Sequence, residues 1–153
     1  MSGKESGRTD NQAWITVLRE HGYRLTDARK AVVDVVANSQ CLLRPAEVFD
    51  IARKNYPRLG LVSVYRTIEK LEELGLIQRV HREQDCQAFV ATSRGHQHLL
   101  LCTRCGKFVY FEGADLENLF SSVEQDTGFV TQDHWMQIFG ICPQCQRETG
   151  KDQ

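Results

Sequence analysis

The sequence contains no run of about 20 apolar residues, the length that a membrane-spanning helix requires. Residues 1–10 form a polar arm without the apolar segment of a secretion signal. No internal repeat is present, and the first half carries no motif of a known enzyme class. We therefore expect a cytoplasmic protein with no membrane segment, which folds as one domain or two small ones.

The sequence also has no excess of basic residues, since its 153 residues include 19 Lys and Arg and 20 Asp and Glu. The charge is unevenly distributed, however. Up to residue 92 there are 14 basic and 12 acidic residues, and beyond it there are 5 and 8. Residues 24–66 alone carry 8 basic and 4 acidic residues. The weak positive bias of the first half is consistent with an anionic partner such as DNA.

Four of the six cysteines are arranged in two C-x-x-C pairs, Cys102/Cys105 and Cys142/Cys145. Two such knuckles supply the four sulfurs of a closed tetrahedral zinc site, in which the metal holds structure and performs no chemistry. Disulfides or redox-active pairs are the alternative, but a redox motif of the thioredoxin type needs only one pair. The remaining Cys41 and Cys86 are interpreted as small buried apolar residues.

The first half of the chain reads as a winged helix, that is, a helical bundle followed by a β-hairpin. Thr26 is a suitable N-cap for the second helix, and Pro45 suits the first position of the third. The predicted elements are helices near 13–21, from Thr26, from Pro45 and at 63–74, and strands at 76–80 and 88–90.

The helix at 63–74 has one apolar and one polar face. The residues expected to face the core are Val64, Ile68, Leu71 and Leu74, and those expected outside are Ser63, Arg66, Thr67 and Lys70. A hydroxyl, the Tyr65 phenol and an arginine near a helix N-terminus suit entry into the DNA major groove. The alternative is a polar face that is merely solvated.

The second half reads as a small α/β unit. The predicted elements are strands at 98–102, 107–111 and 134–141 and a helix at 115–123. A unit this small needs a zinc staple and suggests a partner subunit. The fold class is thus α+β, with an N-terminal arm (1–12), a winged-helix domain (13–92), a hinge (93–97), a dimerisation and metal-binding domain (98–146) and a polar tail (147–153).

A second group of potential ligands consists of His96, His98, Glu117 and His134. Three imidazoles and a carboxylate suit Zn²⁺, Fe²⁺ or Mn²⁺, and zinc if the ion is four-coordinate. Each histidine taken alone is more simply a surface residue. A hydrolytic metalloenzyme is the rival interpretation, but four protein ligands leave no open coordination position.

Taken together, these motifs resemble the ferric uptake regulator family of metal-dependent repressors. The matching segments run in order along the chain: Gly22-x-Arg24-x-Thr26-x-x-Arg29, Ser63-Val-Tyr65-Arg66, His96-x-His98, and the two C-x-x-C pairs. The resemblance implies a homodimer that binds palindromic double-stranded DNA operators of metal-uptake genes when loaded with metal. It also implies one structural zinc per subunit and an exchangeable divalent metal beside the hinge.

The resemblance assigns roles to particular residues. It implies that Ser63, Tyr65 and Arg66 contact DNA from the recognition helix, and that Arg24, with Arg29 in the same motif, adds a minor-groove contact. Regulatory-metal ligands would be His96, Glu117 and His134, with His98 at a position often held by Asp. That histidine favours zinc over Fe²⁺ or Mn²⁺ as the sensed metal.

Two features depart from the family pattern, and the first is Ala28, which stands where a proline before Arg29 is usual. Histidines are sparse before the first knuckle, where Gln97 and Leu99 stand, which argues against a further inter-domain site and against peroxide sensing. His81 and Cys86 are alternative ligands in the wing.

Overall fold

The computed structural model describes residues 11–81, 87–92, 97–113 and 116–149. The chain forms two compact units, Met1–Ser93 and Arg94–Gln153. The predicted ligands His96 and Cys86, and most of the predicted N-terminal arm and hinge, lie outside the described residues. No helix in the described ranges is long and apolar enough to span a bilayer.

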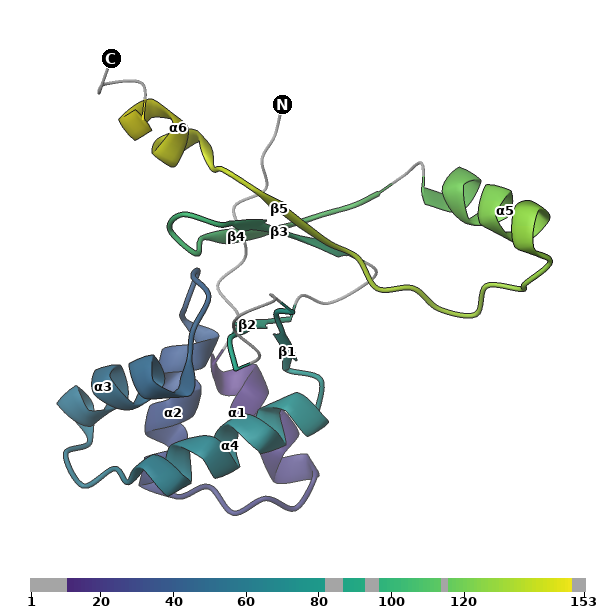
Figure 1. Ribbon diagram of the computed structural model, residues 1–153. Helices are drawn as coiled ribbons and strands as arrows, with labels where there is room; N and C mark the ends of the chain where they lie inside the picture. The colour runs from purple at the N-terminus through teal and green to yellow at the C-terminus, as the bar shows by residue number, and fades with distance from the viewer. Residues whose placement is uncertain (1–10, 82–86, 93–96, 114–115, 150–153) are drawn as a thin grey trace. The chain divides into compact units, whose positions relative to one another are not determined.

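Four helices build the first unit: α1 (Asn11–Glu20), α2 (Asp27–Ala37), α3 (Pro45–Asn55) and α4 (Leu61–Glu73) (Figure 1). Each contributes one apolar stripe to a shared core, in which α2 packs against the other three. The fully buried side chains at its centre come from all four helices and the following strands, and the largest include Leu18, Val32, Val48, Ile68, Leu71 and Phe89.

The helix boundaries follow from local chemistry. The Thr26 hydroxyl accepts a hydrogen bond from the Arg29 backbone N–H at 3.2 Å, which caps α2 as predicted. Pro45 occupies the first position of α3, also as predicted, and the Glu47 carboxylate accepts the Arg44 N–H at 2.8 Å. The α4 helix begins at Leu61, two residues earlier than predicted, because Gly60 takes the cap position.

One prediction for α4 and one for a cysteine were wrong. Thr67, expected outside, is only 2% exposed, and its hydroxyl donates to the Ser63 carbonyl oxygen at 2.7 Å. This bond within the helix satisfies the hydroxyl, so the side chain can be buried at little cost. Cys41, expected to be buried, is exposed, in the segment between α2 and α3.

A two-stranded hairpin completes the first unit. β1 (Ile77–Arg79) pairs antiparallel with β2 (Phe89–Ala91), and Leu43 forms a bridge to Phe89 that adds the α2–α3 segment to the hairpin edge. Arg79 donates to both carboxylate oxygens of Glu72 at 2.8–3.0 Å, which fastens β1 to α4. The predicted winged-helix arrangement is thereby confirmed.

The second unit contains a three-stranded sheet. Its elements are β3 (His98–Cys102), β4 (Phe108–Phe111), α5 (Leu116–Thr127), β5 (Gln137–Gly140) and α6 (Pro143–Thr149). The strand order is β4-β3-β5, with β3 antiparallel to β4 and parallel to β5. Helix α6 was not predicted, and β5 is shorter than the predicted strand at 134–141.

Much of the apolar surface of the second unit is exposed. Helix α5 has an amphipathic sequence but buries none of its described residues. The exposed apolar side chains of this unit include Leu119, Val123, Phe129, Val130, Trp135 and Ile141. An apolar surface of this kind indicates that the unit is completed by another protein chain.

Candidate metal centre and DNA-binding face

The two cysteine knuckles meet because β3 and β5 are parallel. In the sheet register Cys102 at the end of β3 lies opposite Gly140 at the end of β5. The carboxyl ends of parallel strands share one edge of the sheet, so the chain enters both knuckles there. Gly106, at a φ of 75°, lets the first knuckle turn back into β4.

The four sulfurs are arranged as a tetrahedral metal site requires. All lie within 4.8 Å of one another. The Cys102 and Cys145 Sγ atoms are 3.9 Å apart, and those of Cys105 and Cys142 are 3.7 Å apart. Four ligands at a zinc–sulfur distance of about 2.3 Å would stand about 3.8 Å from one another, whereas a disulfide would bring two sulfurs to about 2.05 Å. The geometry therefore fits a metal and excludes disulfides between these pairs.

The thiols differ in their tendency to ionise. Burial opposes ionisation of Cys102, but backbone N–H groups of Cys105, Cys142 and Arg104 outweigh it and lower its pKa to about 6. The Cys145 N–H, in the first turn of α6, similarly lowers the pKa of Cys142. Burial raises the pKa of Cys145 to about 12. A bound cation is therefore needed to hold all four as thiolates at neutral pH.

Protein hydrogen bonds also connect the two knuckles. The Cys142 N–H donates to the Cys102 sulfur at 3.4 Å, and Thr103 N–H donates to the Gly140 carbonyl at 2.9 Å. Arg104 Nη1 donates to the carbonyl oxygen of Cys145 at 3.2 Å. These bonds tie the two knuckles to each other and to the end of β5.

The structure brings together two of the four predicted regulatory ligands. His98 opens β3 and is 4% exposed, and the centroid of its ring lies 5.2 Å from that of His134. Two phenylalanines pack on this histidine pair. Phe111 lies opposite His98 in the sheet register, with ring centroids 5.5 Å apart, and the ring centroid of Phe120 of α5 lies 4.2 Å from that of His134. A β-carbon built on Gly113 would lie 2.5 Å from Leu116 Cδ1 and 3.1 Å from His98 Cδ2, so any other residue here would crowd both side chains.

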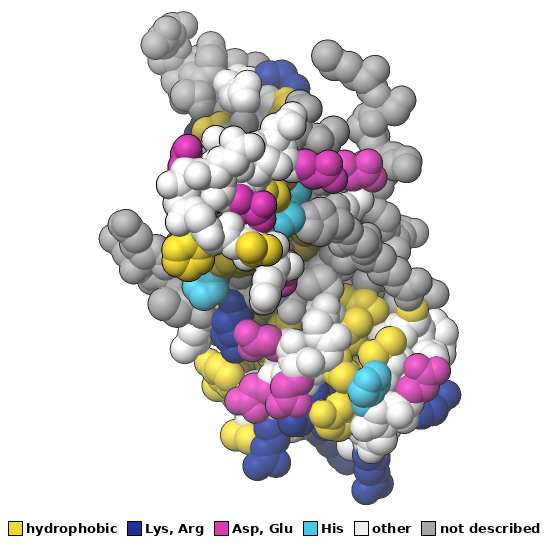
Figure 2. Space-filling view, turned by 90° about the vertical axis from the view of Figure 1, so that its right-hand side faces the viewer, with side chains coloured by type: hydrophobic (Ala, Val, Ile, Leu, Met, Phe, Trp, Pro, Cys, Tyr) yellow, Lys and Arg dark blue, Asp and Glu magenta, His cyan; other side chains and the backbone are white. Residues whose placement is uncertain are grey.

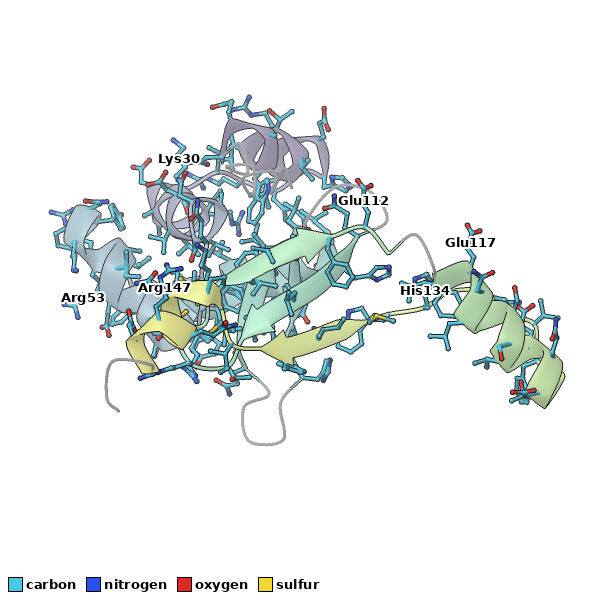
Figure 3. All side chains as sticks on the ribbon, turned by 90° about the horizontal axis from the view of Figure 1, so that it is seen from above. Lys30, Arg53, Glu112, Glu117, His134 and Arg147 are labelled. Atoms are coloured by element: carbon cyan, nitrogen blue, oxygen red, sulfur yellow. The ribbon has the colours of Figure 1, made fainter. Side chains whose placement is uncertain are left out.

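Glu117 lies in the same region but is not in contact with the histidine pair in the way that the two histidines contact each other. It projects from the first turn of α5 and is exposed, while His134 lies beside the start of that helix (Figure 3). Within the described ranges, three or more potential metal ligands come this close together at one place, the four cysteines, whose donor atoms lie within 4.8 Å of one another. The histidine region is thus less compact than the cysteine site.

The candidate DNA-binding face is formed by α4. Tyr65 is 39% exposed, and its hydroxyl donates to Gln87 Oε1 at 3.5 Å, which links α4 to the hairpin. Arg66 is exposed, and within the described part of the chain its guanidinium has no hydrogen-bond or ion-pair partner. Ser63 is half-buried. Figure 2 shows Lys and Arg side chains along the lower rim of the first unit.

The loop between α1 and α2 is fastened to the same helix. The Tyr23 hydroxyl donates to Glu73 Oε2 at 3.2 Å, and its ring lies below Lys70 Nζ, 5.5 Å away. Lys70 donates to Glu73 at 2.9 Å; this bond raises the pKa of Lys70 and lowers that of Glu73, so both stay charged. Sequence analysis missed this cluster, because nothing local predicts a contact across 50 positions.

Arg24 and Arg29 play different parts in that loop. Arg24 is exposed, whereas Arg29 is half-buried and donates from Nη1 to the Arg24 carbonyl oxygen. The Arg29 guanidinium also lies 5.8 Å from the centre of the Tyr23 ring. Arg29 therefore has structural partners that occupy part of its guanidinium.

Comparison with known proteins decides between the remaining interpretations. A sequence model of the ferric uptake regulator family matches residues 20–139. The chain belongs to this family. The ferric uptake regulator family consists of metal-responsive DNA-binding regulators of transcription that act as dimers, and this excludes the enzyme interpretation. It also explains the exposed apolar surface of the second unit.

Individual relatives and structures agree with the family assignment. The chain is 25% identical over 132 residues to the peroxide-responsive repressor PerR of Staphylococcus saprophyticus, covering 86% of this chain and 88% of the relative. It is 24% identical over 133 residues to the ferric uptake regulation protein of Neisseria meningitidis, covering 86% and 92%.

Solved structures show the same fold. The ferric uptake regulator of Helicobacter pylori matches with a TM-score of 0.68 at 23% identity, over 94% of this chain and 97% of that one. A zinc uptake regulator in complex with zinc and DNA matches with a TM-score of 0.68 at 18% identity, over 96% and 99%.

Proposed function

We propose that the chain is a zinc-responsive, cytoplasmic, homodimeric repressor that binds palindromic operators of metal-uptake genes in its metal-loaded form. The proposal is supported by two groups of potential metal ligands in the second unit, one of thiols and one of imidazoles. Their donor atoms suit two different tasks: permanent structural binding and reversible sensing.

The cysteine site is proposed to hold one structural Zn²⁺ per subunit. Cys102, Cys105, Cys142 and Cys145 supply four thiolates at the separations that tetrahedral zinc needs. The ion would neutralise thiolates that burial otherwise disfavours and would join the two knuckles. Such a site leaves no open position, so its role is to stabilise the dimerisation unit.

The sensed ion is proposed to bind at His98 and His134, with Glu117 and His96 as the further ligands. Two imidazoles already in contact favour zinc over harder ions, which prefer carboxylates. Metal binding requires neutral imidazoles, so binding at such a site weakens when acid protonates the histidines. Glu117 would complete the site after a change of side-chain conformation.

The position of these ligands in the chain suggests how binding is transmitted to DNA. His96 and His98 follow directly after the boundary of the two units, at residues 93 and 94. Their engagement with His134 and Glu117 would restrain the chain where the units join. A dimer restrained in this way would present two α4 helices one turn of DNA apart, about 34 Å. The expected coupling between metal and DNA is about 1–3 kcal/mol.

The test is a titration of the wild-type dimer with Zn²⁺, Fe²⁺ and Mn²⁺, with the cysteine zinc left in place. Affinity is measured by fluorescence anisotropy, at one salt concentration, for duplexes from the organism's own upstream regions. The proposal is supported if zinc alone increases the affinity of the dimer for the duplex. If Fe²⁺ or Mn²⁺ increases the affinity instead, the histidine site senses that ion. If no metal changes the affinity, the His98–His134 region does not regulate DNA binding.

A further inference from the structure

The most exposed of the large apolar side chains on α4 belongs to Val62. Val62 is the second residue of the helix and is 63% exposed, while its neighbours Leu59 and Val64 are buried. Valine is a poorer helix former than alanine, because its branched side chain loses rotamer freedom in a helix. Neither core packing nor helix propensity therefore accounts for a valine here.

Val62 lies on the same face of α4 as two predicted DNA-contacting residues. Tyr65 and Arg66 follow at i+3 and i+4, so the three side chains lie on one face of α4. This face carries an aliphatic group, a phenol whose hydroxyl reaches Gln87, and a guanidinium with no partner in the described part of the chain. It is the face that the proposed function directs into the major groove.

The major groove offers one apolar group to such a face, the C5-methyl group of thymine. A protein partner would instead require a contiguous apolar patch, but here an arginine adjoins the valine on the same face. The Arg66 cation and the helix N-terminus both favour polyanionic DNA over an apolar protein surface.

We infer that Val62 is a specificity-determining residue that contacts the C5-methyl group of a thymine in each half of the operator. This inference rests on the proposed function, in which α4 enters the major groove. Burial of one methyl group is worth about fourfold in affinity. In a symmetric dimer the two half-sites together would contribute about the square of that factor.

Deoxyuridine provides the test, because it removes the methyl group of thymine and leaves base pairing intact. The probe is a duplex that the wild-type zinc-loaded protein selects from random sequence, with symmetry-related thymines replaced pair by pair. We expect one pair whose replacement weakens wild-type binding about 16-fold. The same replacement should leave Val62→Ala binding unchanged. Leu61→Ala, an adjacent exposed aliphatic, is the matched control and should keep the wild-type sensitivity.

The outcomes separate the inference from the proposed function. Val62→Ala is an exposed change to a better helix former, so loss of folding is not expected, and circular dichroism checks it. If Val62→Ala remains as sensitive to deoxyuridine as wild type, or wild type is insensitive at every thymine, the inference is wrong. Arg66→Ala is run beside it: if this variant binds the selected duplex as wild type does, the assignment of α4 fails as well.

Discussion

Arg29 donates a hydrogen bond from its guanidinium to the backbone carbonyl oxygen of Arg24. Both arginines belong to the motif that suggested DNA contact, yet only Arg24 is fully exposed. The relationship makes Arg29 a positioning residue, which fixes the backbone of the loop so that the Arg24 side chain projects into solvent.

The first prediction concerns this pair. Arg24→Ala and Arg29→Ala should each weaken operator binding about tenfold, and the double variant should be little worse than either, since both changes remove one contact. Lys30→Ala, beside Arg29 and exposed, is the control and should change little. Anisotropy titrations over a range of salt concentrations measure the effect; additive losses, each lowering the salt slope by about one, would show that Arg29 contacts phosphate itself.

Arg66 should contribute to base recognition. Its guanidinium, which has no partner in the described part of the chain, can bind the O6 and N7 atoms of guanine. Arg66→Ala should therefore cost about 1–3 kcal/mol of operator affinity and leave non-specific binding nearly intact. Arg19→Ala, an equal change of charge on α1, serves as the comparison. Zinc content should be the same in both variants. If the variant loses equal affinity for operator and random DNA, Arg66 contacts phosphate and does not read a base.

Removal of the proposed structural zinc should unfold the second unit. Cys145→Ser leaves three sulfurs and should abolish zinc retention, at an apparent cost of about 10 kcal/mol to that unit. Cys41→Ser, at the exposed cysteine of the first unit, should keep zinc and stability. Metal analysis by mass spectrometry and thermal unfolding followed by circular dichroism report the two effects. A Cys145→Ser protein with full zinc and wild-type unfolding would contradict the site.

His134 should be required for the response to metal and dispensable for the fold. His134→Ala should remain a dimer with its cysteine zinc, but added Zn²⁺ should no longer tighten operator binding by the expected factor of about 5 to 150. His21→Ala, at an exposed histidine just after α1, is the comparison. A His134→Ala protein that still responds to zinc would move the regulatory site elsewhere.

The apolar side of α5 should support dimerisation. Leu119→Glu places a carboxylate among exposed apolar residues and should shift the protein from dimer toward monomer in analytical ultracentrifugation. Ser121→Glu, on the opposite side of the same helix, adds the same charge and should leave the dimer unchanged. If both variants remain dimeric, the subunits associate through another surface.

Sequence reasoning was successful where the signal is local. Thr26 and Pro45 mark helix starts because a hydroxyl cap and a fixed φ act within one turn. The cysteine site followed from spacing alone, since C-x-x-C brings two sulfurs to one ion whatever surrounds them. The burial of Thr67 was missed because its polarity suggested solvent, while its bond to Ser63 makes burial possible.

Long-range relationships were not predictable in the same way. The sequence did not reveal that β5 runs parallel to β3, because β4 and α5 lie between them. Pro143 lies inside the second C-x-x-C pair, and it also suits the first position of a helix and begins α6. The proximity of His98 and His134 likewise depends on the sheet, and no spacing within either segment indicates it.

The parallel pairing of β3 with β5 also has a consequence for biosynthesis. On the ribosome β3 emerges with only β4 as an available partner, and its other edge stays open until α5 and β5 have been made. The first unit, in contrast, has all its described helices and strands before β3 begins. We therefore expect the DNA-binding unit to fold during synthesis, whereas the second unit closes only when the last cysteines emerge and can capture metal.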